Sequence, residues 1–220
     1  MTKTDIPLIE IPRSVQVFPR QVIEDLGARN IQSVLQTIGV GPSSPAFSSR
    51  LFDGFRFRGF VNTTNLRNGL RDPNSGYAVD PSNTERIEVI RGPASVLYGQ
   101  LSPGGIVNRV TKQPLFEPYY FAQMQIGSYD FYQPAIDFSS PLNAERTLSY
   151  RLNASYLSSN SFVDFVNQQR YFVAPAVSWQ IDKNTSLTVD GEYQNVEKPN
   201  GDAELTAMPK QVKSLLIFKI

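Results

Sequence analysis

The chain of 220 residues contains no cysteine and no histidine. The absence of cysteine excludes disulfide bonds and thiolate metal sites. The absence of histidine removes the commonest metal ligand and general base. Together these absences argue against an enzyme, although Asp, Glu, Ser and Tyr could still act in catalysis. The formal net charge is +1, so there is no electrostatic case for binding nucleic acid.

The sequence also lacks an apolar run of about 18 residues, so no transmembrane helix is expected. Transmembrane β-strands are only about 9–11 residues long and carry a weaker signal. The first five residues, Met1 to Asp5, begin neither a basic nor an apolar segment, and no secretory signal peptide is recognised. An exported protein needs such a signal, so we expect that the native start differs from Met1 or that the gene is broken.

Residues 1–116 have the mixed pattern of an α+β domain. Ser14 to Phe18 alternates like a strand, and Gln21 to Leu26 is a short helix that Gly27 ends. Asn30 can cap a second helix whose apolar stripe consists of Ile31, Val34, Leu35 and Ile38. Short strands are expected at 55–60, 66–71, 86–91 and 106–111, with loops over 41–54 and 72–84.

From about residue 117 the pattern changes to period-two alternation. Five strands of about ten residues are predicted, at 119–127, 131–139, 147–157, 171–181 and 185–195. Aromatic residues gather toward the strand ends, as at membrane interfaces: Tyr119, Tyr120, Tyr132, Tyr171, Phe172 and Tyr193. A soluble antiparallel sandwich also alternates, but globular strands average about 5–6 residues. The strand length therefore favours a membrane protein.

Two consecutive motifs carry a family resemblance. Glu85 to Gly99, ERIEVIRGPASVLYG, reads as a strand, a Gly-Pro break and a short helical turn. Ser102 to Lys112, SPGGIVNRVTK, reads as a turn and a second strand. Together they resemble the signature of the plug domain of TonB-dependent outer-membrane receptors. The resemblance runs from about residue 5 to 195 and is nearest to siderophore receptors of the ferrichrome type.

The resemblance implies an α+β plug domain over 1–116, followed over 117–200 by the first antiparallel strands of a transmembrane β-barrel. Such a plug sits in the polar lumen of a barrel of about 22 strands, and its charged residues contact the barrel wall. The residues expected in this role are Arg58, Glu85, Arg86, Glu88 and Arg91, with Asp137, Arg151, Asp190 and Glu192 as candidate partners on the lumen side.

By the same resemblance, two plug loops contact the ligand. Arg50 and Phe52 in the first loop and Tyr77 in the second are the candidate ligand-binding residues. Arg and Tyr donors suit an oxygen-rich iron chelate without ligating the metal. No cofactor is expected, and iron enters only within a bound siderophore. The implied partners are a ferric siderophore, the TonB complex and outer-membrane lipid, although no TonB-binding segment is recognised in residues 1–11.

Five strands cannot close a barrel of about 22, because an open sheet in lipid leaves unpaired backbone groups at its edges. We therefore expect a truncated outer-membrane receptor that is inactive in transport by itself. The tail 201–220, with its apolar end from Ser214 to Ile220, stays unassigned. Two other readings stay open: a plug-like periplasmic module that binds a ligand or partner, and a soluble β-rich enzyme.

Overall fold

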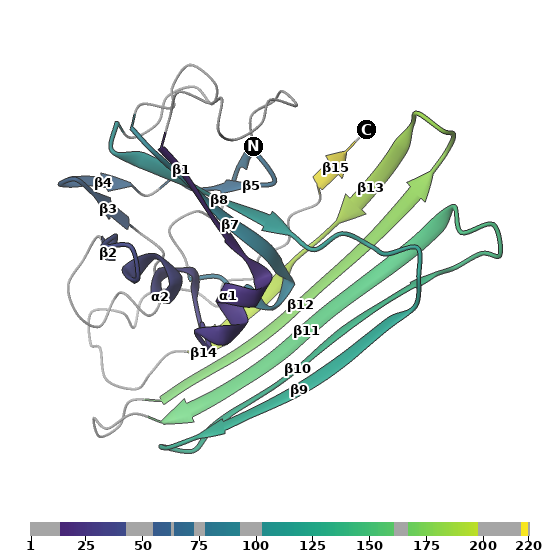
Figure 1. Cartoon of the computed structure of the whole chain (residues 1–220). Helices are drawn as coiled ribbons and strands as arrows, with labels where there is room; N and C mark the ends of the chain where they lie inside the picture. The colour runs from purple at the N-terminus through teal and green to yellow at the C-terminus, as the bar shows by residue number, and fades with distance from the viewer. Residues whose placement is uncertain are drawn as a thin grey trace. The chain divides into compact units, whose positions relative to one another are not determined.

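The computed structural model describes residues 14–42, 55–62, 64–72, 78–92, 103–160, 167–197 and 217–219. The chain divides into two compact units, Met1–Lys112 and Gln113–Ile220. No helix in the described part of the chain has the length and apolar character needed to cross a membrane. The predicted order, an α+β domain and then long antiparallel strands, is confirmed (Figure 1).

The N-terminal unit is built on a mixed five-stranded sheet in the order β1-β7-β8-β5-β6. All pairs are antiparallel except β5 with β8, which run parallel. The elements of this unit are β1 (Ser14–Pro19), α1 (Arg20–Asp25), α2 (Ile31–Gln36), β2 (Gly41–Pro42), β3 (Phe55–Phe57), β4 (Phe60–Asn62), β5 (Leu66–Arg67), β6 (Leu70–Arg71), the 3₁₀ helix η3 (Pro81–Asn83), β7 (Thr84–Arg91) and β8 (Gly105–Thr111).

Both short helices form as the sequence predicts. The Asn30 side chain accepts a hydrogen bond from the Ser33 N–H at 2.9 Å, which caps α2. Buried side chains of the helices and of the strands pack together in one apolar core. Its members are Ile23, Ile31, Val34, Leu35, Val40, Phe55, Phe57, Ile87, Val89 and Val107. This core holds β7 and β8 in the middle of the sheet.

Two predicted strands are in fact hairpins. Residues 55–60 reverse direction at Arg58 (φ 49°) and Gly59 (φ 88°), between β3 and β4. Residues 66–71 reverse at Asn68 (φ 51°) and Gly69 (φ 79°), between β5 and β6. Positive φ at two consecutive residues is the geometry of a tight two-residue turn, in which Gly is favoured. The Asn-Gly pair was a signal for this turn that the prediction passed over.

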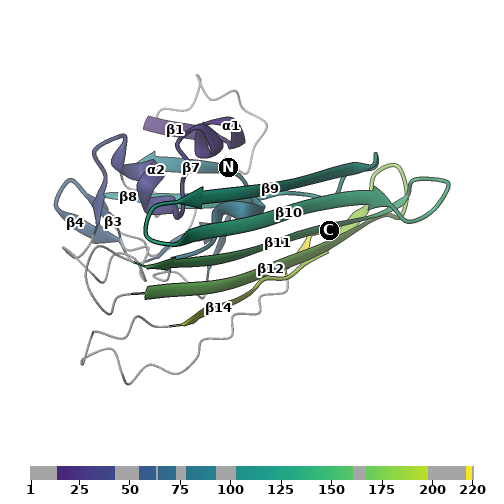
Figure 2. The ribbon, with the colours of Figure 1, turned by 90° about the horizontal axis from the view of Figure 1, so that it is seen from below.

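The C-terminal unit is one antiparallel sheet in the order β15-β13-β12-β11-β10-β9, and β14 pairs with β12 beyond β13. Its strands are β9 (Tyr119–Gly127), β10 (Phe131–Pro141), β11 (Leu148–Asn160), β12 (Asn167–Gln180), β13 (Ser186–Asp190), β14 (Tyr193–Glu197) and β15 (Ile217–Lys219). Both views show the four long strands β9 to β12 lying side by side (Figures 1 and 2). The short piece β15 lies in the tail that the sequence left unassigned.

The fifth predicted strand, 185–195, is split into β13 and β14. Both pieces pair with β12 in one continuous register, from Ala176↔Asp190 to Val173↔Tyr193. The gap falls opposite Pro175, whose carbonyl accepts a hydrogen bond from the Gly191 N–H at 2.9 Å. Proline has no N–H to return, so the ladder is interrupted at this point and the strand assignment breaks there.

Candidate functional site

Charged residues on β7 form a hydrogen-bonded group within the N-terminal unit. Arg86 Nε donates to Glu88 Oε1 at 2.7 Å, and Asn108 Nδ2 on β8 donates to Glu88 Oε2 at 2.8 Å. Glu88 is only 3% exposed, and these two donors compensate for its removal from water. The prediction that Glu88 lies off the apolar face holds, but its carboxylate is buried and already paired.

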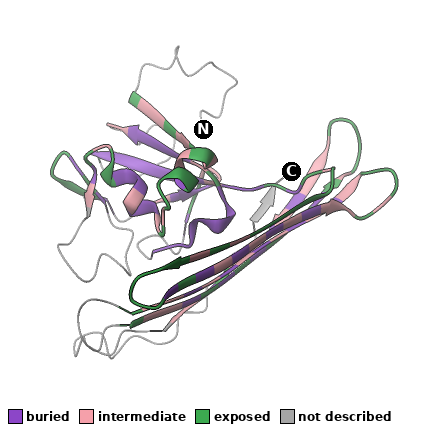
Figure 3. Cartoon of the chain, turned by 60° about the horizontal axis from the view of Figure 1, so that its bottom comes forward, coloured by how far each residue is buried: buried purple, intermediate pink, exposed green. Residues whose placement is uncertain are grey.

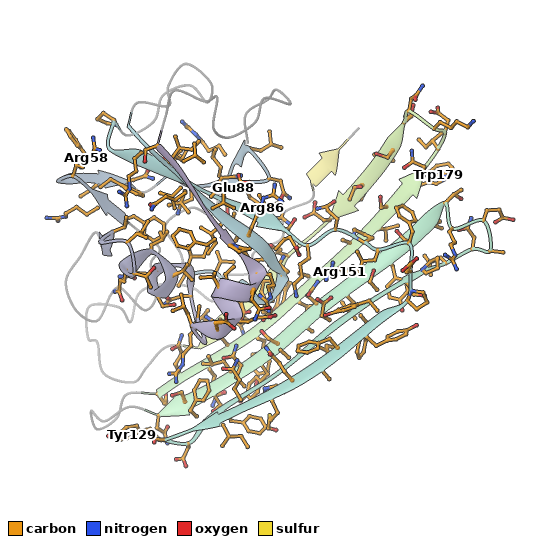
Figure 4. All side chains as sticks on the ribbon, viewed as in Figure 1. Arg58, Arg86, Glu88, Tyr129, Arg151 and Trp179 are labelled. Atoms are coloured by element: carbon orange, nitrogen blue, oxygen red, sulfur yellow. The ribbon has the colours of Figure 1, made fainter. Side chains whose placement is uncertain are left out.

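The other predicted contact residues of the plug lie elsewhere on the unit. Arg58 is exposed in the β3–β4 turn, apart from Arg86 and Glu88 (Figure 4). Glu85 is exposed on β7. Arg91 is half-buried and donates from Nη2 to the Ile38 carbonyl at 3.1 Å, which ties the end of β7 to the turn after α2. The structure thus brings two of the five residues together and leaves Arg58 and Glu85 open to a partner.

The predicted ligand-binding residues Arg50, Phe52 and Tyr77 lie outside the described residues. Ala78, the residue that follows Tyr77, is buried. Asp80 is fully buried and accepts a hydrogen bond from the Ser82 N–H at 2.8 Å, which starts η3.

The sheet of the C-terminal unit has an inverted polarity. Along most of β10, β11 and β12, buried and less buried residues alternate (Figure 3). The buried face is largely polar and includes Gln133, Asp137, Ser139, Ser149, Arg151, Asn153, Ser155, Arg170, Ser178, Thr188 and Asp190. A soluble domain would bury apolar residues instead. A polar face turned inward is the arrangement of a strand that lines a polar lumen.

The opposite face is apolar and outward. Cross-strand neighbours continue it from strand to strand, as in Met124–Pro134 and Tyr150–Val177. Its exposed side chains include Tyr120 at 65%, Ile126 at 77% and Trp179 at 49%. A contiguous apolar surface of this kind marks contact with another apolar phase, and the strand lengths suit a lipid bilayer.

Aromatic residues form two rows across the outward face. The first row consists of Tyr132, Tyr156 and Tyr171, with ring centroids 6.4 Å and 4.7 Å apart in succession. The second row is nearer the other end of the strands and consists of Tyr120, Phe138, Tyr150 and Trp179, with the first two rings 5.8 Å apart. Figure 4 shows Tyr129 and Trp179 at opposite ends of the sheet. Paired aromatic rows are typical of membrane interfaces.

Two of the predicted interface aromatics are not on this face. Phe172 is 1% exposed and belongs to the polar, buried face, because it follows Tyr171 and alternation turns it inward. Tyr119 likewise lies opposite to Tyr120, and its ring is 5.6 Å from the Arg151 guanidinium carbon. The period-two pattern therefore predicted the face on which an aromatic residue lies better than its position near a strand end did.

An ion pair crosses β10 and β11 on the polar face. Arg151 contacts Asp137 through two hydrogen bonds of 2.8 Å, from Nε to Oδ1 and from Nη2 to Oδ2. The side chains are 8% and 4% exposed. These two residues were predicted as partners for charges on the plug, but here they bind each other. Such a fork-shaped pair is a strong form of charge-assisted hydrogen bond.

The sequence prediction missed two residues at the start of this unit, Gln113 and Leu115, and their partner Ser139 on β10. Arg151 Nη1 also donates to the Gln113 carbonyl at 2.8 Å. Ser139 Oγ accepts from the Leu115 N–H at 2.8 Å and donates to the Tyr150 carbonyl at 2.7 Å. The available signal was Pro114, which cannot donate in a ladder and so makes its neighbours depend on side-chain partners.

The family model of the TonB-dependent receptor plug domain matches residues 7–106. The match covers the described core of the N-terminal unit and both motifs around β7 and β8. The chain carries the plug domain of TonB-dependent receptors. The predicted resemblance is thereby confirmed for this part of the sequence.

Relatives extend the likeness past the plug domain. The metal-pseudopaline receptor CntO of Pseudomonas aeruginosa is 39% identical over 87% of this chain and 27% of its own length. The ferrichrome outer membrane transporter/phage receptor of Escherichia coli K12 is 34% identical over 88% of this chain and 27% of its own length. The crystal structure of the ferripyoverdine receptor of the Pseudomonas aeruginosa outer membrane superposes with a TM-score of 0.80, at 25% identity, over 89% of this chain and 27% of that one.

The chain thus spans about a quarter of the length of the relatives it matches. All three are named as receptors or transporters, and none of the three names is that of an enzyme. The fold of both units, the mixed sheet and the antiparallel strands after it, is that of the N-terminal part of such receptors.

Proposed function

We propose that the chain serves in the TonB-dependent uptake of ferric siderophores through the bacterial outer membrane. The N-terminal unit, residues 1–112, is the plug, and residues 117–200 are strands that face lipid on one side and a polar lumen on the other. The observation that carries this proposal is the polarity of the sheet, which places Val177 and Trp179 outward and Ser139 and Asn153 inward. That polarity supports a sheet in lipid over a periplasmic module that works in water.

The substrate class follows from chemistry and from the relatives. Their names refer to ferrichrome and to metal-pseudopaline, both of them metal chelates. Such a chelate presents oxygen atoms that accept hydrogen bonds, so Arg50 and Tyr77 would donate to it and Phe52 would contact its apolar part. Iron is carried as cargo inside the chelate and needs no ligand from this chain.

The plug would contact the lumen wall mainly through its exposed charges. Arg58 and Glu85 are the best placed, because both are exposed. The other three predicted residues are half-buried or buried and are already hydrogen-bonded within the unit: Arg86, Glu88 and Arg91. They would therefore stabilise the local structure of the plug surface without contacting the wall directly. TonB, acting from the inner membrane, and outer-membrane lipid complete the set of proposed partners.

Binding of radiolabelled ferrichrome and ferrioxamine B to the chain in detergent tests the substrate class. We expect saturable binding that Arg50→Ala and Tyr77→Phe each weaken by about 10- to 100-fold, as for loss of a charge-assisted hydrogen bond. Arg146→Ala, in the turn between β10 and β11, is the matched control and should leave binding unchanged. Saturable binding that is insensitive to both loop substitutions would refute the assigned contacts, and no saturable binding would refute the proposed substrate class.

A further inference from the structure

The junction between the two units is sharply defined by its hydrogen bonds. The Lys112 N–H donates to the Asn83 carbonyl at 2.8 Å, inside the N-terminal unit. The next residue, Gln113, accepts through its carbonyl from Arg151 in the C-terminal unit. Two consecutive residues thus make backbone hydrogen bonds within different units.

The segment after Lys112 cannot form a complete backbone hydrogen-bond ladder of its own. Thr111 ends β8 and Tyr119 begins β9, and between them Pro114 and Pro118 lack the N–H that a ladder requires. Pro114 also restricts Gln113 to an extended conformation. This conformation presents the Gln113 carbonyl and the Leu115 N–H, two residues apart, to donors and acceptors on the sheet.

The sheet supplies both partners from its polar face. Arg151 binds the Gln113 carbonyl with its one nitrogen that does not bond Asp137, and the ion pair fixes the direction of the guanidinium. Ser139 is fully buried, and its donation to the Tyr150 carbonyl orients its oxygen toward the Leu115 N–H. Asp137, Ser139 and Arg151 thus form a clamp, which we call the linker clamp.

We propose that the linker clamp makes residues 113–115 mechanically part of the sheet, so that Lys112–Gln113 is the boundary at which the N-terminal unit can open while the sheet stays folded. The clamp would stop the unfolding of residues 1–112 from reaching β9. The boundary is expected from these hydrogen bonds alone and does not depend on the proposed function. Only its relevance to import rests on that function.

Hydrogen exchange of single backbone amides in the full chain, measured by NMR in detergent at increasing urea below global unfolding, tests the boundary. We expect the Leu115 amide to open with the urea dependence of β10 and β11, and the Lys112 amide with that of β7 and β8. If the Leu115 amide instead opens together with β7 and β8, the segment belongs to the N-terminal unit and the proposal is wrong.

Ser139→Ala removes the acceptor of the Leu115 N–H and leaves the ion pair in place. We expect the Leu115 amide to exchange roughly fivefold faster in this variant, as for loss of one hydrogen bond, with the Asn153 amide unchanged. Ser149→Ala is the matched control, because Ser149 is equally buried on the same face and its hydroxyl has no hydrogen-bond partner. An unchanged Leu115 amide in Ser139→Ala, or equal acceleration in Ser149→Ala, would overturn the clamp.

Arg151→Lys provides a second test that keeps the positive charge. Lysine cannot reproduce the fork to Asp137 and reach the Gln113 carbonyl at once. We expect faster exchange at Leu115 in this variant with the amides of β12 and β13 unchanged. Acceleration spread evenly over the whole sheet would indicate a general structural role for Arg151 and would count against the clamp.

Discussion

Replacement of Val177 by arginine tests which solvent the outward face of the sheet contacts. Val177 lies on β12, is 41% exposed, and is paired with Tyr150 on one side and Val189 on the other. If the face is in lipid, the guanidinium must enter the hydrocarbon or distort the bilayer. If the face is in water, an exposed arginine in a strand is nearly neutral.

The magnitude follows from the position of Val177 along the strand. Tyr171 on β12 and Ile181, the residue that follows β12, mark the ends of the outward face and are about ten residues apart. At about 3.3 Å per residue and a tilt of about 40°, they span roughly 25 Å of membrane, which matches the apolar band of outer-membrane proteins. Val177 then lies close to the midplane, where arginine costs about 2–4 kcal/mol. In water the change would stay within about 0.5 kcal/mol.

The assay is urea unfolding of the chain in short-chain phosphatidylcholine vesicles, followed by the emission of the single tryptophan, Trp179. Free energies of unfolding are compared for the parent chain, Val177→Arg and two controls. Ile181→Arg puts the same side chain at the end of the face, where the cost should be only about 0–1 kcal/mol. Val177→Leu keeps the site apolar and should be nearly neutral.

The refuting result is specific. If Val177→Arg and Ile181→Arg cost the same, or if Val177→Arg costs less than about 0.5 kcal/mol, the face does not contact the bilayer midplane. The assignment of the sheet as a membrane-facing wall would then be wrong.

Three further predictions concern single residues. Gly105→Ala should destabilise the N-terminal unit by about 1–3 kcal/mol in urea, because Gly105 has φ 151° and a methyl group would lie 2.7 Å from the Ile90 carbonyl; an alanine variant as stable as the parent would contradict this. Glu88→Gln should cost about 1–3 kcal/mol, measured as faster amide exchange in β7 and β8, whereas Glu85→Gln, at an exposed site, should cost almost nothing. Hydrogen bonds, first from the Asn184 N–H and then from the Thr185 hydroxyl, lower the pKa of Asp182 below its ordinary value of 3.8, so its stabilising contribution is present above that value and is lost as the pH falls through the pKa of the folded state. A carboxyl carbon NMR titration should show the lowered pKa, and a midpoint at or above the ordinary value would disprove it.

The fold was predictable where the sequence signal was a long run of alternating residues or a contact between residues close in sequence. Five segments of period-two alternation gave β9 to β12 and the strand pair β13–β14, and Asn30 gave the cap of α2. The short plug strands were harder, because the turns Arg58-Gly59 and Asn68-Gly69 divide segments that the prediction treated as single strands. The split of the last strand was also missed, since it depends on Pro175 in a different strand.

The candidate site was predictable only in part, for a similar reason. Sequence placed Arg86 and Glu88 on one strand, but the second hydrogen bond to Glu88 comes from Asn108, which β8 brings alongside. Asp137 and Arg151 were recognised as inward-facing charges, yet alternation alone could not show that they bind each other. The register of β10 with β11 decides that contact, and it is a property of the folded sheet.

Pro175 has a consequence for the border of the sheet. Because it gives no hydrogen bond toward Gly191, β13 and β14 are each attached to β12 by a separate ladder of five residue pairs. We expect each ladder to break and re-form with less effect on the other than in an uninterrupted strand. A competing strand could therefore replace one short piece at a time, which requires a lower activation barrier than the release of a single uninterrupted strand of twice that length.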